Sequence, residues 1–207
     1  MDQFSKAKAM LDSGLDLAEA GKHAEAIAAF SQLIADFGGE TDVKIRSLVA
    51  DARLNFGIAL GNLGRRNEEM SCYDELIRQM DVCTKAELRV WAVKARINKA
   101  ISLGLMGRPD AELAIYDGIV ADFSDAENLE LRVQLAKALY NKGYILCEIG
   151  RDADGITSYD EVLVRPLSPA DGRMCHRRKS RLGGPLSTGK GYYIFQNGFS
   201  RGGIGSL

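Results

Sequence analysis

The sequence predicts an all-α protein built from about four stacked helical hairpins, and three regularities predict it. Four glycines recur at intervals of 43 residues: Gly21, Gly64, Gly107 and Gly150. An aromatic residue follows each glycine by nine positions: Phe30, Tyr73, Tyr116 and Tyr159. A leucine precedes each glycine by four positions: Leu17, Leu60, Leu103 and Leu146. A fixed period of this size is typical of a stacked repeat architecture and not of a single mixed core.

Each repeat contains a long segment of helical periodicity before its glycine and a shorter one after it. In the second repeat, Ile45, Val49, Ala52 and Phe56 form an apolar stripe at helical spacing, and a second stripe follows Gly64. Glycine commonly ends a helix in the left-handed conformation, so it joins the two helices of a hairpin. We expect helices at 3–20, 23–37, 43–63, 66–80, 85–106, 109–122, 126–149 and 152–164.

Local signals support these boundaries. Pro109 stands at a helix-start position, and Thr84 with Glu87 and Ser124 with Glu127 have the spacing of capping boxes. Small residues also recur seven positions before the hinges: Gly14, Gly57, Ala100 and Gly143. A larger side chain there would hold the two helices of a hairpin apart, so we expect close helix contact.

Composition indicates a soluble globular protein without a cofactor. The 207 residues are 46% hydrophobic, and no stretch approaches the roughly 18 apolar residues of a membrane span. The first residues carry charges and no apolar leader segment, which favours a cytoplasmic location. The four cysteines have no metal-ligand spacing, so we interpret them as reduced and structural and expect no metal site.

The repeats are expected to form one domain, residues 1–165, and to be followed by a basic, Gly/Pro-rich tail, residues 166–207. The repeats run at about 1–40, 41–83, 84–126 and 127–165. The tail holds seven Lys or Arg against one acid, Asp171, while the body is close to −7 in charge. Such asymmetry suits either a nucleic-acid-binding arm or a self-docking segment. The last hairpin needs a cover, which the Tyr192–Phe195 segment or another protomer would supply.

At this point the chain resembles the tetratricopeptide repeat family. Gly14, Gly21, Ala26 and Phe30 match the family's small-residue, hinge and aromatic positions, and the resemblance covers residues 1 to about 165. The period of 43 exceeds the usual 34 of the family, which makes this a long-repeat variant. The resemblance implies a right-handed α-solenoid whose concave wall is lined by the first helix of each hairpin, and a protein-binding scaffold as its function.

Asparagines recur on this predicted wall as an amide ladder: Asn55, Asn98 and Asn141, with Asp12 in the first repeat. Asparagine is a mediocre residue inside a helix, so its recurrence needs a reason. In one interpretation the amides donate to and accept from the main chain of an extended peptide in the groove. In the other, the residue was inherited through internal duplication and holds a neighbouring helix or faces water.

Other residues are expected on the same wall: Lys94, Lys137, Ile58, Ile101, Tyr144 and Asn62. The lysines could hold acidic groups of a ligand, but a solvated helix face is the favoured interpretation. We assign Trp91 to the core. Arginines also recur near the starts of the long helices, and we expect them to pair with acids such as Asp36, Asp81 or Asp122: Arg46, Arg89 and Arg132.

The sequence therefore predicts a non-catalytic protein-interaction scaffold that binds an extended peptide or partner segment in its concave groove. With only His23 and His176 and no nucleophile–base spacing, no catalytic site is expected. One alternative is a homo-oligomeric scaffold assembled through the uncapped C-terminal hairpin. Another is nucleic-acid binding through the basic tail.

Overall fold

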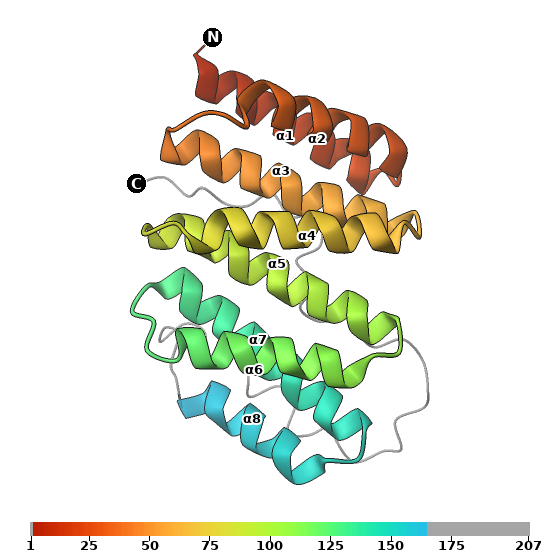
Figure 1. The fold of residues 1–207 in the computed structure, drawn as a ribbon, viewed down its shortest axis with the longest axis vertical. Helices are drawn as coiled ribbons and strands as arrows, with labels where there is room; N and C mark the ends of the chain where they lie inside the picture. The colour runs from red at the N-terminus through yellow and green to blue at the C-terminus, as the bar shows by residue number, and fades with distance from the viewer. Residues whose placement is uncertain (1, 165–207) are drawn as a thin grey trace.

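The computed structural model describes residues 2–164 as a stack of eight α-helices (Figure 1). These helices are α1 (Gln3–Glu19), α2 (His23–Phe37), α3 (Val43–Asn62), α4 (Arg66–Asp81), α5 (Ala86–Leu105), α6 (Pro109–Phe123), α7 (Leu129–Glu148) and α8 (Asp152–Val164). Each odd-numbered helix pairs with the next to form a hairpin, and each hairpin packs on the preceding one. The predicted all-α, stacked-hairpin architecture is confirmed.

The helix contacts define an inner and an outer layer of the stack. The first helices of successive hairpins touch one another in the order α1, α3, α5 and α7. The second helices contact mainly the first helices on either side and make no comparable contact with one another within the described chain. Helices that approach more closely lie on the inside of an arc, so α1, α3, α5 and α7 form the inner wall.

The hinges are Schellman motifs, which explains the periodic glycines and leucines together. Gly64 has φ of 75°, a left-handed conformation that glycine adopts without steric cost, and the other three hinge glycines have φ between 72° and 81°. The Gly64 N–H donates to Gly61 O over 3.0 Å, and the Arg65 N–H donates to Leu60 O over 2.9 Å. This pair of bonds satisfies carbonyls that the end of a helix would leave free.

In the first, second and fourth hairpins, the glycine seven positions before the hinge lies against the aromatic ring of the second helix. A Cβ added to Gly57 would stand 2.5 Å from Tyr73 Cε1, and a Cβ on Gly14 would stand 2.5 Å from Phe30 Cε1. Tyr73 and Phe30 are buried in the core. The expected close helix contact is therefore present, and the glycine gives the space that the ring fills.

Helix α7 begins three residues later than predicted because the capping signal was misassigned. Ser124 is the C-cap of α6, and Asn128 caps α7 by accepting from the Leu131 N–H over 3.1 Å. The other predicted capping box is also not used, since Lys85 is the N-cap of α5 and makes no side-chain cap bond. Thr84, Ser124 and Glu127 belong to the loops between hairpins, and Glu87 lies in the first turn of α5.

Ion pairs tie neighbouring hairpins together, but not through the predicted arginines. Arg96 donates to Asp81 over 2.6 Å and to Asp122 over 2.7 Å, so it joins the ends of α4 and α6. Arg89 instead stacks over the Phe123 ring at 5.0 Å, and Arg46 donates to Cys83 Sγ over 3.1 Å. The prediction is wrong for Arg46 and Arg89: Asp81 and Asp122 pair with Arg96, two helical turns after Arg89, and Asp36 pairs with Lys6 of α1.

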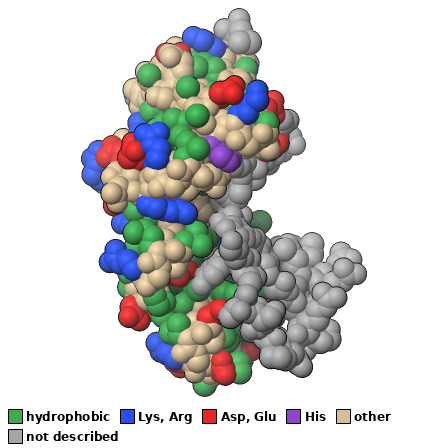
Figure 2. All heavy atoms as spheres, turned by 90° about the vertical axis from the view of Figure 1, so that its right-hand side faces the viewer, with side chains coloured by type: hydrophobic (Ala, Val, Ile, Leu, Met, Phe, Trp, Pro, Cys, Tyr) green, Lys and Arg blue, Asp and Glu red, His purple; other side chains and the backbone are tan. Residues whose placement is uncertain are grey.

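The edge of the stack that carries the hinges exposes one apolar residue immediately before each of the last three hinge glycines: Leu63, Met106 and Ile149. Figure 2 views the stack from this side and shows hydrophobic side chains interspersed with Lys and Arg along it. Among the described helices, none combines the length and apolarity needed to cross a bilayer. The predicted tail, residues 166–207, lies outside the described residues.

We predict opposite effects for the same substitution at two helical glycines. Gly57→Ala should lower the free energy of unfolding by about 1–3 kcal/mol, because the added methyl group overlaps the Tyr73 ring. Gly118→Ala in α6 should raise it by up to about 1 kcal/mol, because this exposed glycine has open space around it and alanine favours a helix. Urea denaturation followed by circular dichroism measures both, and equal effects would contradict the packing argument.

Candidate functional site

The candidate site is the inner wall formed by α1, α3, α5 and α7, where the predicted amide ladder can be followed residue by residue. Asn55 is buried in α3, and its Nδ2 donates to Asp51 O over 2.9 Å and to Asp51 Oδ1 over 2.7 Å. Its donor capacity is therefore used within its own helix. Asn55 holds the Asp51 carboxyl in place one helical turn earlier.

The next two amides have different surroundings. Asn98 in α5 is 6% exposed, and its Nδ2 has no hydrogen-bond partner in the described part of the chain. Asn141 in α7 is half-buried beside the Tyr116 hydroxyl of α6, although its Nδ2 likewise makes no hydrogen bond of normal geometry to a described residue. A buried donor without an acceptor costs about 1–3 kcal/mol, which an acceptor from a ligand would recover.

The position one turn before the amides carries charges that lie close together on the wall. Burial raises the pKa of Asp51 to about 7, and Lys94 and the Asn55 hydrogen bond oppose that shift. Asp12 and Glu130 raise it further by repulsion. The Asp12 Oδ2 atom lies 3.8 Å from Lys8 Nζ. One electrostatic cluster thus extends from α1 to α7.

Lys94 is held in this cluster and does not project into solvent as the favoured interpretation expected. Its side chain is 13% exposed, its Nζ lies 3.2 Å from Glu130 Oε1, and the same nitrogen stands 3.9 Å from the centre of the Trp91 ring. Trp91 is buried in the core of the second and third hairpins, as predicted. Packing against the indole and pairing with Glu130 together explain how this lysine is tolerated with little solvent contact.

Lys137 extends the cluster to the fourth hairpin. Burial and repulsion from Lys94 lower its pKa, while Glu130 raises it. Two partly buried lysines on neighbouring helices therefore repel each other across one carboxylate. Glu130 is not among the wall residues predicted from the sequence, because it precedes Lys137 by seven residues, two helical turns.

The remaining predicted wall residues differ in accessibility. Ile58 and Tyr144 are half-buried, Ile101 is almost fully buried, and Asn62 is exposed at the end of α3. Tyr144 packs against a small cluster that includes Leu113 of α6. The structure thus brings the charged residues together, while these four are spread along the hinge-side half of the wall.

Behind the wall, a buried carboxyl occurs at a position where the first repeat has Ala26. Glu69 of α4 is fully partnered: its Oε1 accepts from Ser102 Oγ over 2.5 Å and from Tyr73 Oη over 3.3 Å. Its Oε2 accepts from Arg66 over 2.7 Å. A buried carboxylate with this many donors is compatible with the core.

Glu112 occupies the equivalent position in the third repeat with fewer donors. Its Oε1 accepts from Tyr116 Oη over 3.1 Å, and its buried Oε2 has no partner among the described residues. Pro109 and Ile145 stand 43 residues after Arg66 and Ser102, so both of those donors are missing. Burial raises the pKa of Glu112 to about 7, against the effect of the Tyr116 hydrogen bond.

The described residues contain no group of three or more His, Cys, Asp or Glu arranged to hold a metal ion. Cys72, Cys83 and Cys147 are free thiols, and burial raises the pKa of Cys72 to about 11. A thiol with a raised pKa is a poor nucleophile at neutral pH.

Comparison with known proteins supports the resemblance in the first hairpin. Residues 8–39 match the tetratricopeptide repeat family. No curated protein matches the chain. The match covers α1 from Lys8 onward and all of α2, and repeats of this family generally mediate interactions between proteins.

We predict that stability falls as the pH rises from about 4.5 to 7. In this range Glu112 is protonated in the folded state and ionised in the unfolded state, so folding binds a proton. Asp51 acts in the same direction between its ordinary value of 3.8 and about 7. Each group lowers the free energy of unfolding by up to about 1.4 kcal/mol per pH unit.

The variant Glu112→Gln tests whether the Glu112 carboxyl is protonated in the folded protein. It should weaken the pH dependence and raise stability at pH 8 by roughly 1–3 kcal/mol, with little change at pH 4. Glu127→Gln, at an exposed position, is the control and should leave the pH dependence as it is. Urea unfolding at several pH values measures the effect. An unchanged slope in Glu112→Gln would show that this carboxyl is ionised in the folded protein.

Proposed function

We propose that this protein is a non-catalytic interaction scaffold that holds an extended segment of a partner protein along its inner wall. The observation that carries the proposal is the Nδ2 atom of Asn98, a buried donor without a partner in the described chain, on the helix at the centre of the wall. A peptide carbonyl is the acceptor that such an amide takes in an extended ligand. The match of the first hairpin to tetratricopeptide repeats supports this class of function.

The charges of the wall favour a particular kind of segment. Lys94 and Lys137 repel each other and have Glu130 between them, so an acidic side chain of the ligand would lower that repulsion. Asp51 lies near the middle of the cluster and has a pKa raised to about 7, so near neutral pH it is partly protonated. It therefore tolerates an uncharged or basic ligand group beside it. The proposed ligand therefore carries an acidic residue toward the C-terminal hairpins and a neutral or basic residue toward the N-terminal ones.

The wall also offers apolar contact next to the polar groups. Ile58, Ile101 and Tyr144 recur at the position three residues after each amide. In an extended peptide, side chains alternate between two sides, so one side would contact these residues while the main chain meets the amides. Binding would combine main-chain hydrogen bonds for affinity with side-chain contacts for specificity.

The test begins with a displayed library of random dodecapeptides selected on the immobilised full-length protein. The affinity of a selected peptide is then measured by calorimetry for the parent protein and for Asn98→Ala, Asn141→Ala and Lys94→Ala. Each substitution should weaken binding by roughly 3- to 30-fold, the effect of about one net hydrogen bond or one partly buried ion pair. Asn67→Ala, exposed on the second helix of its hairpin, is the matched control.

The salt dependence separates the charged contacts from the amide contacts. Affinity for the parent protein should fall when NaCl is raised from 0.05 to 0.5 M, on the order of a few-fold, because partly exposed charges are screened. Lys94→Ala should show a smaller fall. Selected peptides that bind all three wall variants as tightly as the parent protein would rule out the inner wall as the binding site.

A further inference from the structure

In the third hairpin, an aromatic residue at the end of the second helix packs against cations of the first helix. Phe123, the last residue of α6, is 3% exposed, and the guanidinium groups of Arg89 and Arg96 lie 5.0 and 5.9 Å from the centre of its ring. Asp122 beside it pairs with Arg96 at 2.7 Å. An acidic residue followed by an aromatic residue therefore docks against cations of the hairpin's own first helix.

The first hairpin uses the same arrangement. Phe37 ends α2 and is buried, and the Lys6 ammonium of α1 lies 5.6 Å from the centre of its ring. Asp36 lies 4.0 Å from the same Lys6 nitrogen. Asp36-Phe37 and Asp122-Phe123 are the two places in the whole sequence where an acid directly precedes an aromatic residue. In both, the ring fills the space between the first helix and the end of the second.

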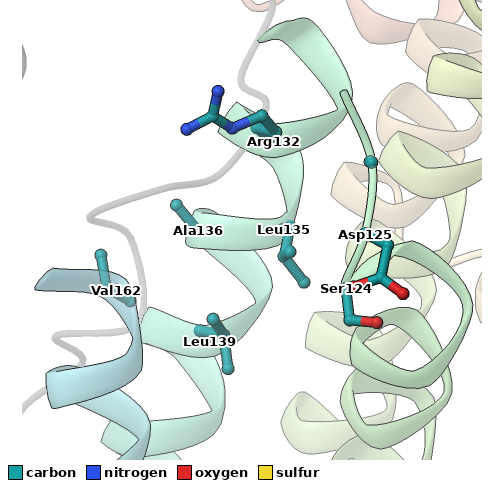
Figure 3. A pocket seen from close by; sticks show the side chains of 8 residues that line it. Ser124, Asp125, Arg132, Leu135, Ala136, Leu139 and Val162 are labelled. Atoms are coloured by element: carbon teal, nitrogen blue, oxygen red, sulfur yellow. The ribbon is translucent and has the colours of Figure 1, made fainter. Parts of the chain in front are cut away.

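Among the described residues, the corresponding space of the fourth hairpin is a cavity of about 250 Å³ (Figure 3). It is lined by Arg132, Leu135, Ala136 and Leu139 of α7, by Val162 of α8, and by the loop residues Ser124, Asp125 and Ala126. Arg132, Leu139 and Val162 stand 43 residues after Arg89, Arg96 and Ile119. Helix α8 ends at Val164, and position 166, which corresponds to Phe123, is a proline.

We propose that this cavity is a binding site for the aromatic side chain of a partner protein, presented by a segment in which an acidic residue precedes the aromatic one. The ring would lie against Leu135, Leu139 and Val162, which Figure 3 shows on two facing helices. A dry cavity of about 150 Å³ lined by aliphatic groups accommodates benzene, so a phenyl ring fits this volume. The site is separate from the amides of the inner wall and does not depend on their function.

Charge and sequence favour a partner over other occupants. Arg132 at the rim attracts the acid of such a segment, while Asp125 on the opposite rim directs that acid toward the Arg132 side. The 43 residues after Val164 contain one acid, Asp171, followed by glycine, so they offer no acid–aromatic pair. In a second copy of the chain the aromatic residue of each pair, Phe37 or Phe123, is already buried in its own hairpin.

The probe is a synthetic peptide that copies residues 114–125, AIYDGIVADFSD, acetylated, amidated and labelled with fluorescein. Its binding to the full-length protein is followed by fluorescence anisotropy. Alanine in place of the phenylalanine should weaken binding by about tenfold to a hundredfold, because the buried ring supplies most of the apolar contact. Asparagine in place of the preceding aspartate should weaken it by a few-fold.

Two protein variants locate the site. Ala136→Phe places a ring in the cavity and should abolish binding, whereas Ala136→Ser keeps the cavity open and should bind like the parent. Chemical shift changes of the Leu135, Leu139 and Val162 methyl groups on addition of the peptide give a second readout that does not depend on any variant. These methyl groups should shift, and those of Leu33 and Leu76 in the earlier hairpins should not.

A third variant tests the chain's own tail as the occupant. Serine in place of Tyr192, Tyr193, Ile194 and Phe195 in the full-length chain should leave the affinity for the peptide unchanged. Binding that appears only after this replacement would overturn the proposal and assign the cavity to the tail. Equal affinity for the peptides with and without the phenylalanine, or shifts confined to other hairpins, would also overturn it.

Discussion

The close approach of the two helices in each hairpin is the constraint on which the rest of the structure depends. At Gly57 and Gly14 the missing side chain lets the ring of Tyr73 or Phe30 lie directly on the backbone of the first helix. The left-handed hinge glycine seven residues later then reverses the chain, so that the second helix packs back against the first and keeps this contact. With the hairpin geometry fixed in this way, successive hairpins repeat the same relation, and the first helices come together as a continuous inner wall.

The same contact determines where polar groups become buried. A tyrosine ring on the helix backbone brings its hydroxyl to the adjacent turn, and there Glu69 and Glu112 accept from Tyr73 and Tyr116. Glu69 is satisfied because Arg66 and Ser102 also donate to it. Glu112 lacks both donors because its repeat has Pro109 and Ile145 at the equivalent positions. The hydrogen bonds of such a buried carboxyl therefore depend on residues of two hairpins, and a substitution in either hairpin changes its protonation.

Much of the fold could be predicted from the sequence because the residues that set the hairpin geometry are few and recur at one spacing. Helix bounds agree within about one residue wherever a hinge glycine defines them. The start of α7 was missed because Ser124 with Glu127 carries a local capping signal, whereas Asn128 supplies the cap that the packed loop uses.

The side-chain contacts between hairpins were harder to predict from the sequence. The burial of Lys94 depends on Trp91 beneath it and on Glu130 from the next hairpin, and the pairing of Arg96 depends on two acids 15 and 26 residues away in sequence. Contacts between hairpins follow from their three-dimensional stacking, which a period alone does not specify.

The departures from the repeat, not the repeat itself, hold the features that could distinguish this protein from other stacked hairpins. Arg96 closes one junction between hairpins with two ion pairs, and Leu139, at the equivalent position, lines the cavity that the described residues form in the fourth hairpin. Asp51 stands where the other three repeats have Lys8, Lys94 and Lys137. Its burial raises its pKa to about 7, against the effect of Lys94, so the wall has one carboxyl that titrates near neutral pH. Each of these is a single-residue change that leaves the glycine–aromatic contacts untouched. Because the architecture depends on those contacts, the chain can vary the charge of its inner wall and the shape of its last junction at little cost to the stack.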